Sequence, residues 1–140
     1  MTDEYDEGLL KFQSTLPAPD LLLKGIHEFN SGAYFEQHET LETAWRKERG
    51  PIRLLYQGIL QVGVAYLHIQ NQNYAGALKV LGRAIQHLSR LPSSCQTVDV
   101  EQLRSDAATV MTELKRLGPD RIGLFNPVLL RPVQFVDLKK

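Results

Sequence analysis

The sequence predicts an all-α fold, a compact array of about five helices in which each helix packs antiparallel to the next. Over long stretches of the chain, apolar residues recur every three or four positions, a spacing typical of helices with one buried face. Short breaks rich in Asn, Gly and Pro separate these stretches, and such breaks end helices and join antiparallel neighbours. No two segments alternate strongly enough to predict a sheet.

The helix boundaries follow from these breaks. A polar segment, residues 1–18, is interpreted as a loose N-terminal arm. The tail, residues 124–140, alternates proline with apolar residues and is expected to lie extended across the bundle. Between them, helices are expected over residues 20–30, 33–49, 51–72, 74–91 and 99–117, with a loop at 92–97.

Composition excludes several classes of protein. A chain of 140 residues fits a single domain, residues 1–140. Its 16 basic and 16 acidic residues cancel, so we expect no nucleic-acid or membrane partner, while weak self-repulsion makes a homo-oligomer possible. The most apolar stretch, residues 52–69, contains Arg53 and His68 and is too polar to span a membrane. The acidic N-terminus lacks the features of a signal peptide, so a cytoplasmic location is expected. Cys95 is the only cysteine, which excludes an internal disulfide.

One short pattern is similar to a helical repeat. Residues 73–78, Asn-Tyr-Ala-Gly-Ala-Leu, resemble part of a tetratricopeptide motif, and residues 30–34 are a weaker copy. The spacing between the two exceeds the tetratricopeptide period, and there are too few copies to form a solenoid. The pattern therefore predicts tetratricopeptide-like helix packing and no repeat array.

Polar side chains interrupt the apolar face expected for the helix over residues 33–49. At 100° per residue, His38 and Glu42 fall on the same side as Phe35, Leu41 and Trp45. Glu39 falls at the edge of this face. Two ionisable side chains therefore occupy positions where leucine is expected.

The next helix shows the same anomaly. It is apolar nearly all round, which predicts that it forms the buried centre of the bundle. Gln57, Gln61 and His68 nevertheless lie on one stripe of it. Because the connection at residues 50–51 is short, the two helices should be antiparallel neighbours whose polar stripes can face each other. A buried polar group without a partner costs about 1–3 kcal/mol, so these groups should bond to one another, to water or to a ligand.

The two polar blocks also resemble a known family. Residues 29–45, Phe-Asn-Ser-Gly-Ala-Tyr-Phe-Glu-Gln-His-Glu-Thr-Leu-Glu-Thr-Ala-Trp, are similar to the signature of the bacterial and archaeal family known as domain of unknown function 309. Residues 57–61, His68 and residues 73–77 resemble its second block, and the similarity covers about residues 22–91. Gln37 stands where the family has a small residue and is expected on an exposed face. The resemblance implies a compact helical fold without an established activity, and a site at His38, Glu39, Glu42, Trp45, Gln57, Gln61 and His68.

The pattern His38-Glu39-x-x-Glu42 permits a metal site. His38 and Glu42 are four residues apart and can reach one divalent cation, as the histidines of His-Glu-x-x-His zinc proteases do. His68 would supply a third ligand and Glu39 the general base of a metal-dependent hydrolase. The alternative is a buried hydrogen-bond network that fixes the register of the helices. A further alternative is a surface pair between Glu42 and Arg46, which weakens every interpretation as a site.

Three functions remain open at this point, and the sequence does not decide whether the chain is an enzyme. The favoured function is a binding module for a small molecule or another protein, in which Glu39 and Glu42 anchor a polar group and Trp45 walls the site. The others are the metal-dependent hydrolase and a structural or oligomerisation module. His27 and His87 have no partner in sequence and are expected to be exposed.

Overall fold

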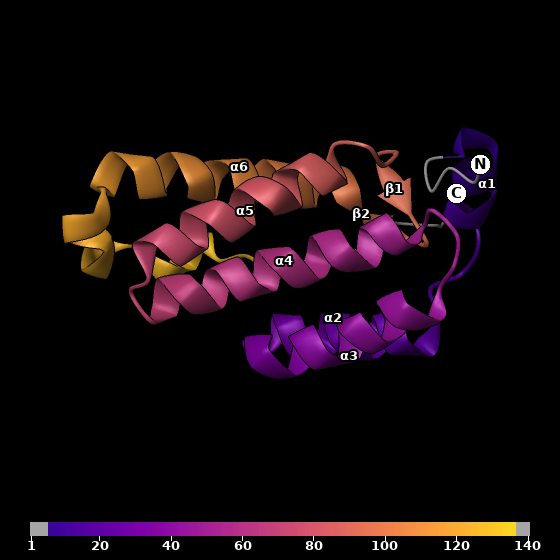
Figure 1. Ribbon diagram of the computed structural model, residues 1–140, viewed down its shortest axis with the longest axis horizontal. Coiled ribbons are helices and arrows are strands. Elements are labelled where there is room, and N and C mark those ends of the chain that lie inside the picture. The colour runs from indigo at the N-terminus through magenta and orange to yellow at the C-terminus, as the bar shows by residue number, and fades with distance from the viewer. Residues whose placement is uncertain (1–5, 137–140) are drawn as a thin grey trace.

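The helices of this protein follow one another along the chain with short connections (Figure 1). A computed structural model describes residues 6–136 of the sequence. Its α-helices are α1 Glu7–Ser14, α2 Asp20–Asn30, α3 Tyr34–Lys47, α4 Arg53–Gln70, α5 Tyr74–Leu88 and α6 Val100–Leu117. Its other elements are strands β1 Ser94–Cys95 and β2 Val98–Asp99 and the 3-10 helices η1 Pro119–Leu124 and η2 Pro127–Leu129. The predicted all-α class is confirmed, with only a small two-stranded hairpin added to the helices.

Local chemistry explains where several helices begin and end. The Asn73 side chain accepts from the Gly76 N–H at the start of α5, and Asp99 accepts from the Gln102 N–H at the start of α6. Gly118, with a φ of 74°, ends α6 in a conformation that suits glycine. These features lie within a few residues of the helix ends that they set, which is why those helix ends could be predicted from the sequence.

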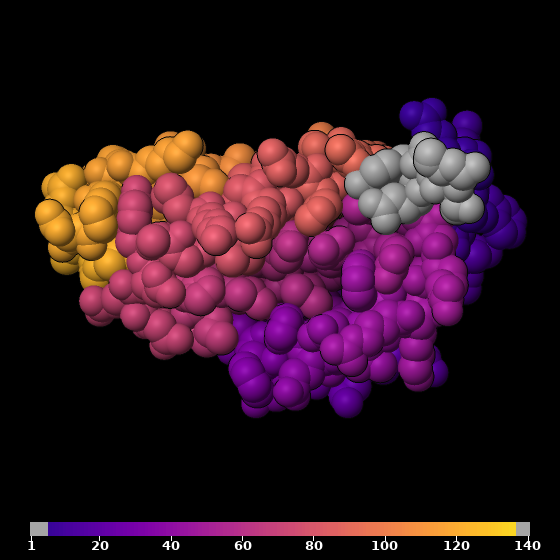
Figure 2. Space-filling view, viewed as in Figure 1, coloured from indigo at the N-terminus to yellow at the C-terminus, as the bar shows by residue number. Residues whose placement is uncertain are grey.

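Each helix packs mainly against its neighbours in sequence, so α2 contacts α3, α3 contacts α4, α4 contacts α5, and α5 contacts α6. Helix α4 lies in the middle of this array (Figure 1), with most of its side chains buried, as predicted. Phe29, Tyr34 and Tyr66 join α2, α3 and α4 in a cluster whose ring centroids are 5.4–5.8 Å apart. In the space-filling view, α2 and α3 form one edge of the molecule (Figure 2).

The N-terminal segment differs from the loose arm that the sequence predicted. Within it, α1 begins after Asp6, whose side chain caps the Leu9 N–H. The Gln13 amide then donates to the Glu48 carboxylate at 2.9 Å and accepts from the Ile52 N–H at 3.1 Å. These bonds hold α1 against the turn between α3 and α4. Residues 1–5 of the predicted arm lie outside the described residues.

The loop predicted at residues 92–97 contains most of a β-hairpin. Cys95 pairs with Val98, and the two residues between them, Gln96 and Thr97, have φ angles of 46° and 69°. Both belong to the left-handed region, as the central residues of a type I′ hairpin turn do. Cys95 is a free, buried cysteine, and burial raises the pKa of its thiol to about 12.

The C-terminal tail is less extended than predicted. Its first residue, Leu124, is the last residue of η1, and η2 occupies Pro127–Leu129, where Pro127 fixes φ near a helical value at the first turn. Only residues 131–136 run extended, and they pass behind α4 in Figure 1 to form a bridge between Phe135 and Val98. Residues 137–140 of the predicted tail lie outside the described residues. Among the helices of residues 6–136, none has the length and apolar character needed to cross a bilayer.

Candidate functional site

The buried face of α3 is centred on Gln37 and not on His38. The side chains that α3 buries are Tyr34, Gln37, Thr40, Leu41 and Ala44. The predicted face was therefore wrong by about one residue, or 100° of rotation. Phe35, which the prediction placed in the core, is 56% exposed.

Close approach of α3 to α4 explains this rotation. The Gln37 amide donates to the Leu60 carbonyl oxygen of α4 at 3.1 Å, and the side chain is fully buried, contrary to the exposed position expected. A Cβ atom built on Gly63 would lie 2.3 Å from the Gln37 Nε2 atom. The two helices thus meet through a glycine and an amide, and His38, Glu42 and Trp45 are left at the edge of the contact.

At that edge, the two predicted polar stripes come together. A hollow of about 230 Å³ lies between α3 and α4. Five of the seven predicted site residues line it together with Leu60: His38, Glu42, Trp45, Gln57 and Gln61. The side chains of His38 and Glu42 remain 39% and 36% exposed, so this is a surface hollow and not a buried network.

Glu42 is paired on both of its oxygens. Its Oε1 lies 3.6 Å from His38 Nε2, and its Oε2 accepts from Arg46 Nη2 at 2.8 Å. The surface pair with Arg46, which the sequence left as an alternative, is therefore formed. Exposed pairs of this kind stabilise a helix by about 0.3–0.5 kcal/mol. The arginine largely offsets the carboxylate charge at the mouth of the hollow.

Trp45 forms one wall of the hollow, and Arg53 packs against its ring. The guanidinium carbon of Arg53 lies 3.9 Å from the centroid of the Trp45 ring, within cation–π range. Arg53 Nη2 also donates to the Trp45 carbonyl oxygen at 3.2 Å. These two contacts fix the indole ring in one orientation and place a second cation beside the site.

The two α4 glutamines that line the hollow differ in what they bind. Gln61 Oε1 lies 2.8 Å from His87 Nδ1 on α5, so His87 is half-buried and paired, which the sequence analysis did not predict. The Gln57 side chain makes no hydrogen bond to any other group within residues 6–136. Its amide therefore keeps both donor and acceptor capacity inside the hollow.

His68 and Glu39 do not belong to this hollow. His68 lies about 10 Å along α4 from Gln61, and its Nδ1 is 3.2 Å from Asn73 Nδ2. Tyr34, the first residue of α3, already packs on Tyr66, so His68 lies beyond the end of α3. Glu39 is exposed on the outer face of α3.

The predicted metal-ligand set of His38, Glu42 and His68 is consequently not assembled. Throughout residues 6–136, no three His, Cys, Asp or Glu side chains are grouped so that they could hold one ion. With Glu39 turned outward as well, no general base stands beside His38 and Glu42. The geometry gives no support to the hydrolase alternative.

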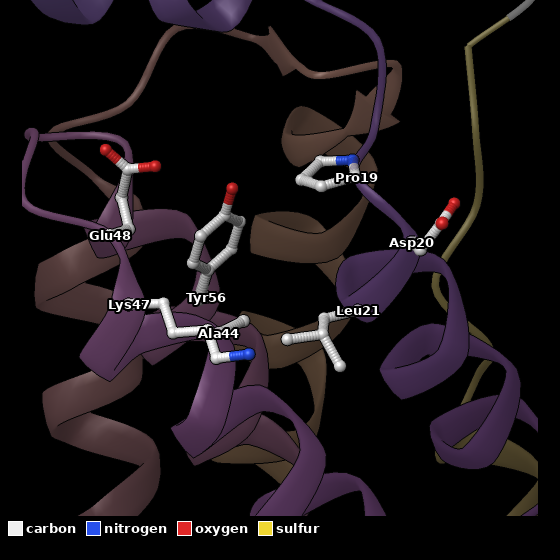
Figure 3. A pocket seen from close by; sticks show the side chains of 7 residues that line it. All are labelled: Pro19, Asp20, Leu21, Ala44, Lys47, Glu48 and Tyr56. Carbon is white, nitrogen blue, oxygen red and sulfur yellow. The ribbon is translucent and has the colours of Figure 1, made fainter.

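A second hollow, of about 290 Å³, lies on the other side of α3 and was not predicted (Figure 3). Figure 3 shows Tyr56 between the start of α2 and the end of α3. The Tyr56 hydroxyl donates to Gln96 Oε1 at 2.9 Å, and burial raises its pKa to about 12. The lining residues come from three separate segments, so no sequence spacing could have grouped them: Pro19, Asp20, Leu21, Ala44, Lys47, Glu48 and Tyr56.

The α3–α4 hollow lies in a part of the chain that matches a known protein family. Residues 22–80 match the model of the family described as a domain of unknown function (DUF309). We refer to residues 22–80, which this model matches, as the DUF309 segment. The DUF309 segment covers nearly all of α2, the whole of α3 and α4, and the first half of α5, so it contains every residue that lines the α3–α4 hollow.

The chain is also similar to a curated protein. The uncharacterized protein YpuF of Bacillus subtilis (strain 168) is 39% identical over 56 residues, which are 39% of this chain and 32% of that protein. The chain thus matches about a third of the length of this relative. Neither the family description nor the name of the relative carries an activity.

Proposed function

We propose that this protein is a helical binding domain that holds a neutral, amide-bearing group of a peptide or protein partner in the α3–α4 hollow. The observation that carries the proposal is the Gln57 side chain, which lines the hollow without a hydrogen-bond partner in residues 6–136. A glutamine amide can donate to and accept from another amide at the same time. A peptide unit, or the side chain of Asn or Gln, has the complementary donor and acceptor.

The charges around the hollow favour a neutral partner group. The Glu42 carboxylate is offset by Arg46 at 2.8 Å, and Arg53 adds a cation that is already stacked on Trp45. A cationic ligand would compete with Arg46 for the Glu42 carboxylate and would be repelled by Arg53. An anionic ligand would lie against that carboxylate. An uncharged amide avoids both costs.

The size of the hollow favours a single residue of a partner over a free cofactor. A volume of about 230 Å³ is smaller than the roughly 300–1,000 Å³ of pockets that enclose drug-sized ligands. Trp45 and Leu60 supply apolar contact beside the polar groups, and tryptophan is among the residues that most often dominate protein interfaces. The hollow is thus suited to one amide side chain of a bound protein.

Trp45 makes this proposal testable, because it is the only tryptophan in the chain. The probes are the acetylated, amidated tripeptides Gly-Gln-Gly, Gly-Asn-Gly, Gly-Lys-Gly and Gly-Glu-Gly, titrated at millimolar concentration. We expect the Gln and Asn peptides to shift the indole N–H resonance of Trp45 and the side-chain amide resonances of Gln57, and the charged peptides to leave them unchanged.

The matched variants are Gln57→Leu, which should abolish these shifts, and Lys79→Ala, an exposed change on α5 that should keep them. If the Gln and Asn peptides leave the Trp45 resonance unmoved, or if Gln57→Leu binds them as the parent does, the proposed function is wrong.

A further inference from the structure

Residues 131–136 lie on the protein as a short extended segment that is held almost without burial. Of these six residues only Val133 is buried, and Arg131, Pro132, Gln134 and Phe135 are exposed. The segment therefore contributes one apolar anchor to the core, and its position depends mainly on polar contacts.

Those contacts are made to the backbone of the segment. Asn30 at the end of α2 holds both backbone groups of Val133: its Nδ2 donates to the carbonyl oxygen at 3.0 Å, and its Oδ1 accepts from the N–H at 2.8 Å. The hairpin adds a bond from the Asp99 N–H to the Gln134 carbonyl and one from the Val136 N–H to the Thr97 carbonyl, both 2.8 Å long. Main-chain bonds plus one side-chain anchor are the means by which proteins hold extended peptides.

Asp106 on α6 shows that the segment is an imperfect occupant. Asp106 is buried, and its Oδ1 accepts from Gln102 Nε2 at 2.9 Å. Arg131 reaches the same oxygen only at 3.8 Å through Nε, and its side chain stays 55% exposed. The other oxygen, Oδ2, is buried without a hydrogen-bond partner in residues 6–136. A buried acceptor left unpaired destabilises the protein, and a guanidinium that bridged both oxygens would remove that cost.

We propose that the tail-binding surface, defined by Asn30, residues 97–99 and Asp106, is a binding site for an extended segment of a partner protein. The partner segment carries an arginine two residues before a small apolar residue, in the spacing of Arg131 and Val133. Residues 131–136 act as an internal competitor at this site, which is separate from the α3–α4 hollow. Arginine is specified over lysine because only a planar guanidinium can bridge both Asp106 oxygens.

Because residues 131–136 are part of the same chain, they compete with any free peptide for the tail-binding surface. A segment joined by a short linker acts at an effective concentration on the order of millimolar, so a free peptide must overcome it. Weakening the internal segment should therefore strengthen binding of a free peptide. The probe is a fluorescent peptide with the sequence of residues 130–136, Leu-Arg-Pro-Val-Gln-Phe-Val, and a second probe has lysine in place of its arginine.

The test compares the full chain with two variants by fluorescence anisotropy. Val133→Asp removes the apolar anchor and should bind the probe at least about tenfold more tightly than the parent chain does. Val128→Asp, an exposed change outside the tail-binding surface, should bind as the parent does. The lysine probe should bind Val133→Asp more weakly than the arginine probe, and adding Asn30→Leu should abolish binding. A folded Val133→Asp chain that does not bind the arginine probe overturns the proposal.

Two further measurements cover the case in which Val133→Asp does not fold. In the parent chain, excess arginine probe should speed hydrogen exchange of the Val133 and Val136 amides while leaving the Tyr66 amide unchanged. Unaltered exchange at Val133 and Val136 contradicts displacement of the segment. Sedimentation should show that the parent chain is a monomer. If the parent chain is instead a dimer, and Asn30→Leu abolishes that dimer, the occupant of the site is a second copy of this chain and the assignment to another protein is overturned.

Discussion

The contact between Gly63 and Gln37 leads to a prediction whose sign is unusual for a helix. Replacing glycine with alanine inside a helix usually stabilises it by about 1 kcal/mol, because glycine loses more backbone freedom on folding. Gly63 lies within α4, yet a Cβ there would stand 2.3 Å from Gln37 Nε2 and 2.7 Å from its Cδ. We expect Gly63→Ala to destabilise the protein.

The magnitude follows from what Gln37 must give up. Its side chain is fully buried, so the amide cannot turn to solvent, and moving it breaks the bond to the Leu60 carbonyl. Leaving a buried amide donor unpaired costs about 2 kcal/mol, and overpacking the contact costs about 2 kcal/mol more. After the gain in helix propensity of about 1 kcal/mol, the net loss should be about 3 kcal/mol.

The chain provides a matched control in Gly82 of α5. The nearest atom to a Cβ built there is Met111 Cε at 4.0 Å, so Gly82→Ala should stabilise the protein by about 1 kcal/mol. Urea unfolding followed by circular dichroism measures both free energies. In a Gln37→Ala background, Gly63→Ala should lose its penalty. The reasoning is refuted if Gly63→Ala has the same free energy of unfolding as the parent chain. It is also refuted if Gly63→Ala lowers that free energy equally in the Gln37→Ala background.

Other predictions concern the wall of the α3–α4 hollow, the alkaline limb of stability and the hairpin. Arg53→Ala removes the cation 3.9 Å from the Trp45 ring, so it should lower the free energy of unfolding in urea by about 1 kcal/mol and shift the tryptophan fluorescence. Arg46→Ala removes only the exposed pair with Glu42 and should lower that free energy by less than about 0.5 kcal/mol. Tyr56 has a pKa of about 12 in the folded chain against 10.0 in model compounds, so its contribution to stability is complete below pH 10 and is lost as pH rises toward 12. Urea titrations at several pH values should therefore show a shallower alkaline decline for Tyr56→Phe. Thr97→Gly should raise the urea midpoint by the equivalent of about 1 kcal/mol, since a β-branched residue with a φ of 69° is strained.

Helix boundaries were predictable where their causes are local. Asn73, Asp99 and Gly118 mark helix ends through side-chain capping or backbone freedom within a few residues of the boundary. Helix α1 also begins at a local cap, Asp6, which the sequence prediction missed. Its docking was not predictable, because it depends on bonds from Gln13 to the distant turn between α3 and α4. The hairpin was missed for a different reason: its turn residues are Gln96 and Thr97, not the asparagine and glycine that usually identify such a turn.

Five of the seven predicted site residues line one hollow, but the sequence did not predict how exposed that hollow is. The stripe of Gln57 and Gln61 on α4 was right because helical rotation alone fixes it. The face of α3 was wrong because hydrophobicity favours Phe35 and Trp45 as core residues. The actual contact uses Gln37, which fits against a glycine of α4. Which positions of two helices stand opposite each other is a tertiary property, and this is why His68 could not be separated from the hollow in advance.

The hairpin at residues 94–99 has a consequence for the order in which the chain folds. Packing between consecutive helices forms from residues close in sequence, and such local contacts form quickly. At the hairpin, by contrast, the Gln96 N–H donates to Ser14 and the Thr97 carbonyl accepts from Val136, so segments near the two ends of the chain meet there. Bringing these segments together costs loop-closure entropy, and the bonds at the hairpin offset that cost only after α2 to α5 have packed. We therefore expect closure at the hairpin to be the last step of folding and the same end of the molecule to be the first to open.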